Sequence, residues 1–440
     1  MSQTQVDMNI NVHHLTRVEG HGNIVVNVKK GVVEKCEWQV PEAPRFFEAM
    51  VRGRHFSEVA RITSRICGIC SVGHTLASVR ATEQALGIQI TPQTKKLRTI
   101  LKHAENFDSH ILHIYFLVAP DLLGVPSVFP LIPTHGEVVK RALRLKRFSH
   151  EWGALIAGRT THPTTIVPGG ITRPLTEKDL KALKTKLIEA VPDIQATAET
   201  VISLAGQIPS FDRPTEYMAL SSDEEYGVYE GCVQTIMPNG EKQRYEAAHY
   251  RSITNEYMTT LSTAKYTRNK MESYAAGALA RFNNHYDQLH PQAKALAQKI
   301  GIKPICSNPF FNTVAQLVEV VHSVYASIEI IDDLLKTGIK QEGLVAPTRY
   351  GLGAAAVEVP RGILFHEYEY DKDFMCVKGN CIIPTNQNHA NIQKDFDKLV
   401  PELLKQNKNE KQIELALEML VRAYDPCISC STHMVKVKFI

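Results

Sequence analysis

Two pairs of cysteines with identical spacing stand near opposite ends of the 440-residue chain. Cys67 and Cys70 form the first pair, and Cys427 and Cys430 form the second. Two thiols with this spacing can bind one metal ion or two adjacent ions, but they fill only half of a four-thiolate site. If the two pairs complete one site, the fold has to bring them together, and the residues between them have to wrap around that closure.

The composition is that of an ordinary globular protein, with 44% hydrophobic and 22% charged residues. A net charge of +4 is small for this length, so neither nucleic acid nor an anionic membrane is indicated as a partner. We find no run of about 18 apolar residues and no secretory signal, so we expect a cytoplasmic protein. Its nine cysteines are then expected to be reduced, which favours metal binding over disulfides.

Hydrophobic periodicity predicts a mainly helical protein with small β-sheets, an α+β fold in which a helical core carries peripheral β elements. An antiparallel β-ribbon is expected over 8–40, and 352–385 is rich in strand signals. Helices are expected at 46–64, 71–86, 94–118, 137–157, 176–191, 193–207, 288–300, 312–336 and 388–423.

We expect a single large domain over residues 1–440, in which 208–285 is a peripheral α+β insertion. That segment is richer in tyrosine and polar residues, and its Asn239-Gly240 pair is typical of a β-hairpin turn. The first cysteine pair directly precedes an expected helix that Ser71 can cap. The amides and the dipole at this helix N-terminus favour thiolate over thiol, as a metal ligand requires.

A structural zinc site is the simplest alternative for two CxxC pairs. Zinc knuckles usually take both pairs from a short stretch, and closing the longer loop here costs about 2.5 kcal/mol more. That difference alone does not exclude zinc. The surroundings weigh more, because a knuckle needs no acid, arginine or extra histidine beside it. Here such residues stand in distinctive local sequences: Glu19, His74, Arg361, Asp425 and His433.

Six segments, in this order, resemble the signatures of nickel–iron hydrogenase large subunits, and the resemblance covers the whole chain. The cysteine segments are 65–74 (RICGICSVGH) and 425–433 (DPCISCSTH). The others are 17–21 (RVEGH), Gly158-Arg159 with His162-Pro163 and Gly169-Gly170, 358–362 (EVPRG), and Ile383-Pro384-Thr385. Each motif is weak alone, but six in order are highly specific.

The resemblance implies that Cys67 and Cys427 are terminal ligands of nickel and that Cys70 and Cys430 bridge nickel to iron. In this family the iron carries cyanide and carbon monoxide, as Ni–Fe(CN)2(CO). Soft thiolates suit such a centre. The remaining cysteines lack ligand spacing and are expected to be inert thiols: Cys36, Cys232, Cys306, Cys376 and Cys381.

Other positions match the family's second metal site, usually occupied by magnesium or another divalent ion. The resemblance makes Glu48 and His433 its ligands, with the main-chain carbonyl of Cys381 as a weaker third. It also implies that His74 donates a hydrogen bond to a bridging sulfur.

Five residues match the catalytic positions around the nickel–iron centre. The resemblance makes Glu19 a proton relay beside Cys427. It places Arg361 over the open coordination site, held by Asp425 through a charge-assisted hydrogen bond. It also implies that Pro360 and Thr385 line the cyanide pocket, where the Thr385 hydroxyl donates to one cyanide.

The implied activity is reversible heterolytic cleavage of H2 into protons and electrons. No further cysteine cluster is present, so we expect no iron–sulfur cluster in this chain, and an iron–sulfur small subunit has to carry the electrons away. Further electron-transfer subunits of flavin or heterodisulfide-reductase type are expected, together with a maturation protease and nickel-insertion proteins. The alternatives are a hydrogen-sensing subunit or a non-catalytic relative of the respiratory complex I type.

One departure concerns the HxxHxY helix. Many membrane-bound uptake enzymes carry an aspartate directly before the first histidine, whereas here Ser109 precedes His110 and Asp108 is one residue earlier. This favours the cytoplasmic hydrogenases linked to NAD(P), coenzyme F420 or a heterodisulfide reductase. The family also predicts that a protease removes the tail 434–440 after His433.

Overall fold

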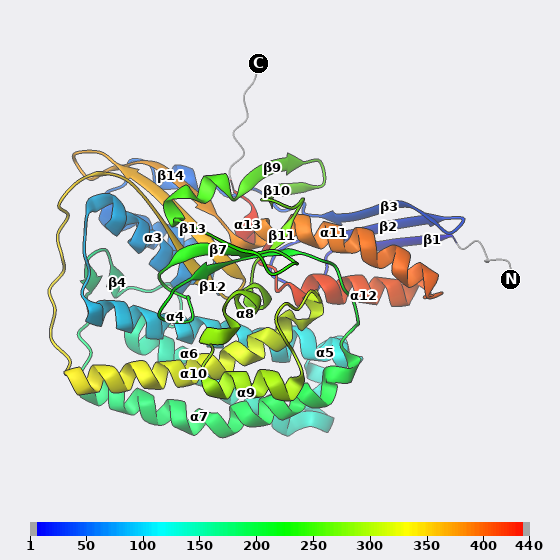
Figure 1. The fold of residues 1–440 in the computed structure, drawn as a ribbon, viewed down its shortest axis with the longest axis horizontal. Helices are drawn as coiled ribbons and strands as arrows, with labels where there is room; N and C mark the ends of the chain where they lie inside the picture. The colour runs from blue at the N-terminus through cyan, green and yellow to red at the C-terminus, as the bar shows by residue number, and fades with distance from the viewer. Residues whose placement is uncertain (1–6, 434–440) are drawn as a thin grey trace, which may run out of the picture.

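The structure is a computed structural model that describes residues 7–433. Long helices gather on one side of the molecule, in the lower half of Figure 1. They are α4 (Pro92–Leu112), α6 (Ile132–Ala157), α7 (Glu177–Leu204), α9 (Pro291–Ile300) and α10 (Asn312–Thr337). Helix α10 packs against α4, α7 and α9, so it lies at the centre of this helical half.

A three-stranded antiparallel sheet supports the first cysteine pair. It consists of β12 (Gly351–Val359), β13 (Gly362–Tyr370) and β14 (Cys376–Ile382), and α3 (Ser71–Leu86) packs against β12 and β13. The approach is close, because a Cβ on Gly353 would lie 2.3 Å from the backbone nitrogen of Ala85. The strand-rich stretch and the helix at 71–86 are confirmed, and α3 ends at Gly87 in the left-handed conformation.

The predicted β-ribbon is confirmed as an antiparallel sheet of β1 (Met8–Val12), β2 (Asn23–Lys29) and β3 (Val32–Gln39). It extends to the right in Figure 1, beside α11 (Pro384–Lys405) and α12 (Glu410–Ala423). Strand β3 packs against α11, and β1 packs against α12. The N-terminal strands therefore dock on the helices that lead to the second cysteine pair.

Residues 208–285 contain two further sheets and a buried helix. One sheet has the order β11 (Tyr274–Ala275), β6 (Glu216–Ser221), β7 (Cys232–Ile236) and β8 (Lys242–Tyr245). The other pairs β9 (Asn255–Thr259) with β10 (Ser262–Arg268). The hairpin at Asn239-Gly240 is confirmed, because β7 and β8 pair antiparallel on either side of it. Helix α8 (Ala278–His285) is buried along its whole length.

Three helix predictions were wrong at their boundaries. The helices expected at 176–191 and 193–207 form one helix, α7, with Pro192 inside it. A capping box between Thr176 and Asp179 starts α7, and its buried stripe continues past Pro192 to Ile194, so burial outweighs the hydrogen bond that proline removes.

The helix expected at 388–423 is two helices, α11 and α12, because Asn407 adopts a left-handed conformation and Asn409 caps α12. The helix expected at 46–64 is also divided, into α1 (Phe47–Met50) and α2 (Phe56–Thr63). Between these two helices, Gly53 has a φ of 72° and donates a backbone hydrogen bond to Cys376. The short elements α5 (Ala119–Leu122), β4 (Ile166–Val167), β5 (Gly170–Ile171) and α13 (Ile428–Ser431) complete the fold.

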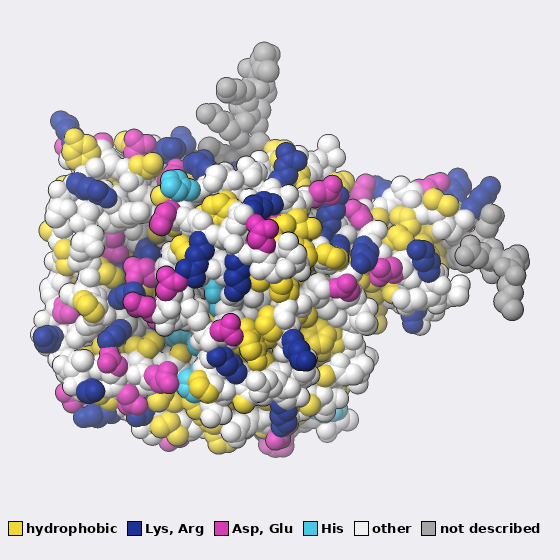
Figure 2. All heavy atoms as spheres, in the orientation of Figure 1, with side chains coloured by type: hydrophobic (Ala, Val, Ile, Leu, Met, Phe, Trp, Pro, Cys, Tyr) yellow, Lys and Arg dark blue, Asp and Glu magenta, His cyan; other side chains and the backbone are white. Residues whose placement is uncertain are grey.

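One segment corrects our interpretation of hydropathy. Residues Pro309–Thr337, which include α10, are long and apolar enough to cross a membrane, although we expected no such run. In the structure 72% of its most apolar stretch is buried inside the protein, as in a core helix. On the face shown in Figure 2, basic and acidic side chains are interspersed, in keeping with the small net charge.

Candidate metal centre

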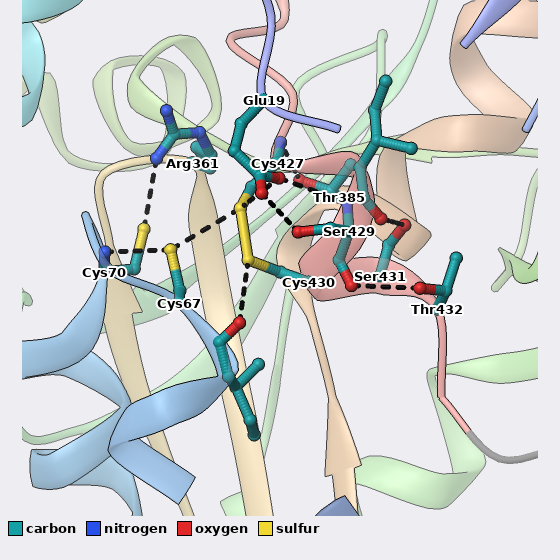
Figure 3. Close-up of a disulfide and its surroundings, with 12 residues drawn as sticks. Glu19, Cys67, Cys70, Arg361, Thr385, Cys427, Ser429, Cys430, Ser431 and Thr432 are labelled. Carbon is teal, nitrogen blue, oxygen red and sulfur yellow. Dashed lines mark hydrogen bonds between the residues drawn. A yellow bond between two sulfur atoms is a disulfide. The ribbon is translucent and has the colours of Figure 1, made fainter. Parts of the chain in front are cut away.

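The two cysteine pairs meet in the interior, as their spacing predicted. Cys67 and Cys70 lie between a 3-10 turn (Ser64–Ile66) and α3, whereas Cys427 and Cys430 lie at α13 (Figure 3). The Sγ atoms of Cys67 and Cys427 are 3.5 Å apart. Those of Cys67, Cys427 and Cys430 all lie within 4.8 Å of one another, and all three residues are buried. This is a donor set for a soft metal ion.

The sulfurs of Cys427 and Cys430 are joined as a disulfide, and the other seven cysteines are free. The expectation that all cysteines are reduced is therefore wrong for this pair, because the short turn of α13 brings its two sulfurs together. Both must be thiolates to bind a metal. The pair becomes a ligand pair after a two-electron reduction.

The first pair is organised by its own backbone and by Arg361. The N–H of Cys70 donates to Sγ of Cys67 at 3.1 Å, and Nη1 of Arg361 donates to Sγ of Cys70 at 3.2 Å. The hydrogen bond from the Cys70 side chain lowers the pKa of the Cys67 thiol, and the Arg361 charge adds to this effect. Cys70 is not a member of the three-sulfur group; its sulfur faces Arg361 (Figure 3).

Arg361 is held by Asp425 through both side chain and backbone, as the resemblance predicted. Nη2 donates to Oδ1 of Asp425 at 2.8 Å, and Nε donates to its carbonyl oxygen at 2.5 Å. Both residues are buried. Although burial opposes the charge, Asp425 keeps the pKa of Arg361 above its usual value. Asp425 has a φ of 49°, an uncommon conformation for a residue with a side chain, which lets its carbonyl and carboxylate face the same guanidinium.

Glu19 lies beside the second pair. Its backbone pairs with that segment, since its N–H donates to the carbonyl of Pro426 and its carbonyl accepts from Ile428. Oε2 lies 3.0 Å from Sγ of Cys427 and accepts from the N–H of Ser429 at 3.1 Å. The Ser429 hydroxyl donates to Oε1. Glu19 is partly exposed, so it connects the buried sulfur with the surface.

Thr385 and Pro360 flank the same segment. The N–H of Cys427 donates to Oγ1 of Thr385 at 3.0 Å, so the hydroxyl keeps its own proton for another acceptor. Thr385 stands in the first turn of α11, and Pro360 lies in the turn between β12 and β13, directly before Arg361.

His74 has a different partner from the expected sulfur at one of its two nitrogens. Its Nδ1 lies 3.2 Å from Nε2 of His366, whose Nδ1 in turn lies 2.6 Å from the hydroxyl of Tyr368. Burial lowers the pKa of His74 well below its usual value. Only Nε2 of His74 therefore remains to face a sulfur.

The three residues assigned to the second metal surround a site that fits an ion. Oε1 of Glu48 accepts from the N–H of Cys381 at 2.9 Å. Both ring nitrogens of His433 are buried and have no hydrogen-bond partner among residues 7–433. Burial lowers the pKa of His433 to about 3, which keeps the ring neutral, as a metal ligand requires. Two unpartnered buried nitrogens beside a buried carboxylate suit a cation.

The sequence did not point to Arg45, which joins the two cysteine loops. Its Nη2 donates to the carbonyl of Ile66 at 2.7 Å and to that of Ser429 at 2.6 Å. An arginine in an irregular segment has no local pattern that indicates such partners. In the HxxHxY helix, Asp108 pairs outward with Lys146, so it does not take the place of the absent aspartate.

Comparison with known proteins agrees with this geometry. The family model for nickel-dependent hydrogenase matches residues 45–141 and 216–433, and a HoxL-like model matches residues 9–43. The alpha chain of sulfhydrogenase 2 from Pyrococcus furiosus is 31% identical over 98% of this chain and 100% of its own length. A component of the F420-non-reducing hydrogenase from Methanothermobacter marburgensis is 30% identical over 96% of this chain and 94% of its own length.

A solved structure gives the same result. The crystal structure of an NAD+-reducing [NiFe]-hydrogenase in the H2-reduced state superposes with a TM-score of 0.87 at 27% identity, covering 97% of this chain and 99% of that one. The chain therefore belongs to the nickel-dependent hydrogenase family, as the large, catalytic subunit of a nickel–iron hydrogenase.

Proposed function

We propose that the four thiolates hold a Ni–Fe(CN)2(CO) centre, with Cys67 and Cys427 as terminal nickel ligands and Cys70 and Cys430 as bridges. The observation that carries this proposal is the convergence of three buried sulfurs within 4.8 Å of one another, with Arg361 hydrogen-bonded to the fourth. When bound, this centre supplies the heterolytic cleavage of H2 into protons and electrons. The protein's own residues then hold the site, orient it and move protons.

The proton leaves through Glu19. Its carboxylate lies 3.0 Å from the Cys427 sulfur, which is within reach for transfer between the two groups. The N–H and hydroxyl of Ser429 hold the carboxylate in place. Because Glu19 is partly exposed, it can pass the proton on toward solvent.

Arg361 supplies a fixed positive charge beside the Cys70 sulfur. Its three nitrogens are occupied by Asp425 and Cys70, so the guanidinium is oriented before any ligand arrives. Thr385 keeps a free hydroxyl proton for a cyanide nitrogen, with Pro360 lining the same pocket. His74 uses its remaining nitrogen for a bridging sulfur.

A second divalent ion, magnesium or another, is held by Glu48, His433 and the carbonyl of Cys381. This proposal is supported by the unpartnered ring nitrogens of His433. His433→Ala is expected to lose this ion while it retains nickel, as measured by elemental analysis of the purified protein. Full retention of the ion in His433→Ala would remove His433 from the ligand set.

An iron–sulfur small subunit receives the electrons, and further electron-transfer subunits of flavin or heterodisulfide-reductase type pass them on. Relatives include a sulfhydrogenase, an F420-non-reducing hydrogenase and an NAD+-reducing hydrogenase, which together favour a cytoplasmic, hetero-oligomeric enzyme. Residues 1–440 act as one catalytic unit, with 208–285 as an insertion.

Maturation involves nickel-insertion proteins and a protease that removes the tail 434–440, which lies outside the described residues. The thiols of Cys427 and Cys430 have to stay accessible until the metals are in place, and removal of the tail then lets the chain close over them. Intact-mass measurement of the active protein tests this step. A fully active chain that ends at Ile440 would contradict it.

The experiment that tests the function is purification of the complex followed by nickel and iron analysis, infrared spectroscopy and a hydrogen-uptake assay. We expect one nickel per chain, carbonyl and cyanide stretching bands, and turnover. Bands and nickel without turnover would favour a hydrogen-sensing subunit. Zinc in place of nickel and iron would favour a structural site.

A further inference from the structure

Helix α10 is apolar enough to resemble a membrane span, yet it carries a buried polar stripe. We define the α10 polar stripe as Asn312, Gln316 and Glu319, which stand at positions i, i+4 and i+7 and therefore share one helix face. Their exposed fractions are 8%, 0% and 1%. Buried polar groups cost free energy unless they are hydrogen-bonded, so their partners indicate what the stripe is for.

Gln316 holds the carboxylate that holds Arg361. Its Nε2 donates to Oδ2 of Asp425 at 3.1 Å, while Oδ1 of the same carboxylate accepts from Arg361. A carboxylate only accepts, so the amide N–H has to face Asp425 and the amide oxygen has to face Nδ1 of His113, 2.5 Å away. Both oxygens of Asp425 are therefore fixed.

Glu319 holds the backbone that carries Arg361. Arg281 donates from Nε and Nη2 to the two oxygens of Glu319, at 2.6 and 2.7 Å. It also donates to the carbonyls of Val359 (2.9 Å) and Pro360 (3.1 Å), the two peptide groups directly before Arg361. A bidentate pair of this kind is geometrically restrictive. The turn between β12 and β13 is thus tied to α10 through one buried arginine.

Asn312 holds the chain that enters the second cysteine pair. Its Nδ2 donates to the carbonyl of Ala423 at 2.8 Å, two residues before Asp425. Its Oδ1 accepts from the N–H of Leu279 at 2.9 Å, in the first turn of α8. One helix face therefore contacts both segments that meet at Arg361.

We propose that the α10 polar stripe positions Arg361, with Gln316 fixing its guanidinium through Asp425 and Glu319 fixing its backbone through Arg281. The proposal rests on the proposed role of Arg361 and adds the residues that set its geometry. An arginine side chain carries about 2 kcal/mol of rotamer entropy, so an unsupported one would sample many positions. A misplacement of about 1 Å can cost roughly a hundredfold in rate.

The test uses the purified enzyme complex and compares Gln316→Leu and the isosteric Glu319→Gln with Ser327→Ala. Ser327 is a matched control, because it is a fully buried polar residue on the same helix, outside the stripe. We expect hydrogen–deuterium exchange to rise at least about fivefold in peptides that cover 359–363 and 423–427 for the two stripe variants. We expect kcat to fall about tenfold, with KM for H2 and the nickel content unchanged. Ser327→Ala should leave all four quantities unchanged.

A double-mutant comparison separates positioning from general stability. In an Arg361→Lys background, Gln316→Leu should reduce kcat by less than about twofold further, because the geometry it protects is already lost. A full additional tenfold loss would show that the stripe acts independently of Arg361 and would overturn the inference. Unchanged exchange at 359–363 and 423–427 would also overturn it. If Arg361→Lys alone keeps normal turnover, the proposed role of Arg361 fails, and the exchange data still decide whether the stripe holds these segments.

Discussion

The two cysteine pairs share one site but are built differently. Cys67 and Cys70 are shaped locally, by a hydrogen bond between them and by the start of α3, a 16-residue helix. Cys427 and Cys430 lie at α13, a helix of only four residues. That segment is held by distant partners, with Glu19 and Thr385 contacting it from far along the chain.

This difference separates two ways of making a ligand pair. A pair at the start of a long helix inherits its geometry from the helix. A pair on a short turn depends on long-range contacts and can change its state when they change, as its disulfide illustrates. We therefore expect the second half of the site to be more sensitive to changes in its surroundings than the first.

The largest effect is expected from removing a ligand in either pair. Cys70→Ala and Cys430→Ala should both abolish hydrogen uptake and bound nickel, because one lost thiolate opens the shared site. Elemental analysis and an uptake assay measure this, and Cys36→Ala is the control, since Cys36 lies in β3. A ligand variant that keeps full nickel and normal uptake would refute a four-thiolate site.

Glu19→Gln is expected to have the next largest effect. The amide keeps the shape of the side chain but cannot take up a proton, so exchange of deuterium with solvent protons should fall at least about a hundredfold. Nickel and iron should stay bound. Isotope exchange followed by mass spectrometry measures this, and unchanged exchange would show that protons leave by another route.

Arg361→Lys tests the contact that connects the two halves. Lysine keeps the charge but lacks the planar fork that contacts Asp425 and Cys70 together. Turnover should fall more than about tenfold, which corresponds to about 1.4 kcal/mol in the barrier, with the metals still loaded. Near-normal turnover in a fully loaded variant would mean that Arg361 has only a structural role.

The smallest effect is expected from Arg45→Lys, which shortens the connection between the cysteine loops. A lysine cannot reproduce both hydrogen bonds to Ile66 and Ser429 from one planar group, so stability should fall by about 1–2 kcal/mol. Turnover should fall less than about fivefold. Thermal unfolding measures the stability change, with the exposed Arg52→Lys as control. Equal stability of the two variants would show that Arg45 does not hold the loops together.

Local features of the fold were predictable because they depend on neighbouring residues. Ser71 and Gly87 bracket α3, and Asn239-Gly240 marks the hairpin between β7 and β8. The continuous α7 was not predictable, because burial along the helix overrides Pro192. Tertiary packing decides such cases, and a single sequence does not display it.

The candidate site divides in the same way. The family motifs indicated that Glu19 lies near Cys427 and that Asp425 holds Arg361, and the structure brings both pairs together. Gln316 and Glu319 were not identified, although polar residues inside an apolar helix are a usable signal of buried partners. Their partners are distant in sequence, so only the folded chain identifies them.

The central claim is that two distant cysteine pairs form one nickel–iron site. Anomalous X-ray diffraction from crystals of the purified complex, recorded at the nickel and iron absorption edges, tests it most directly. We predict one nickel peak within bonding distance of the sulfurs of Cys67, Cys70, Cys427 and Cys430, and one iron peak beside Cys70 and Cys430. A single zinc peak among the four sulfurs, or nickel bound to only one of the two pairs, would contradict it.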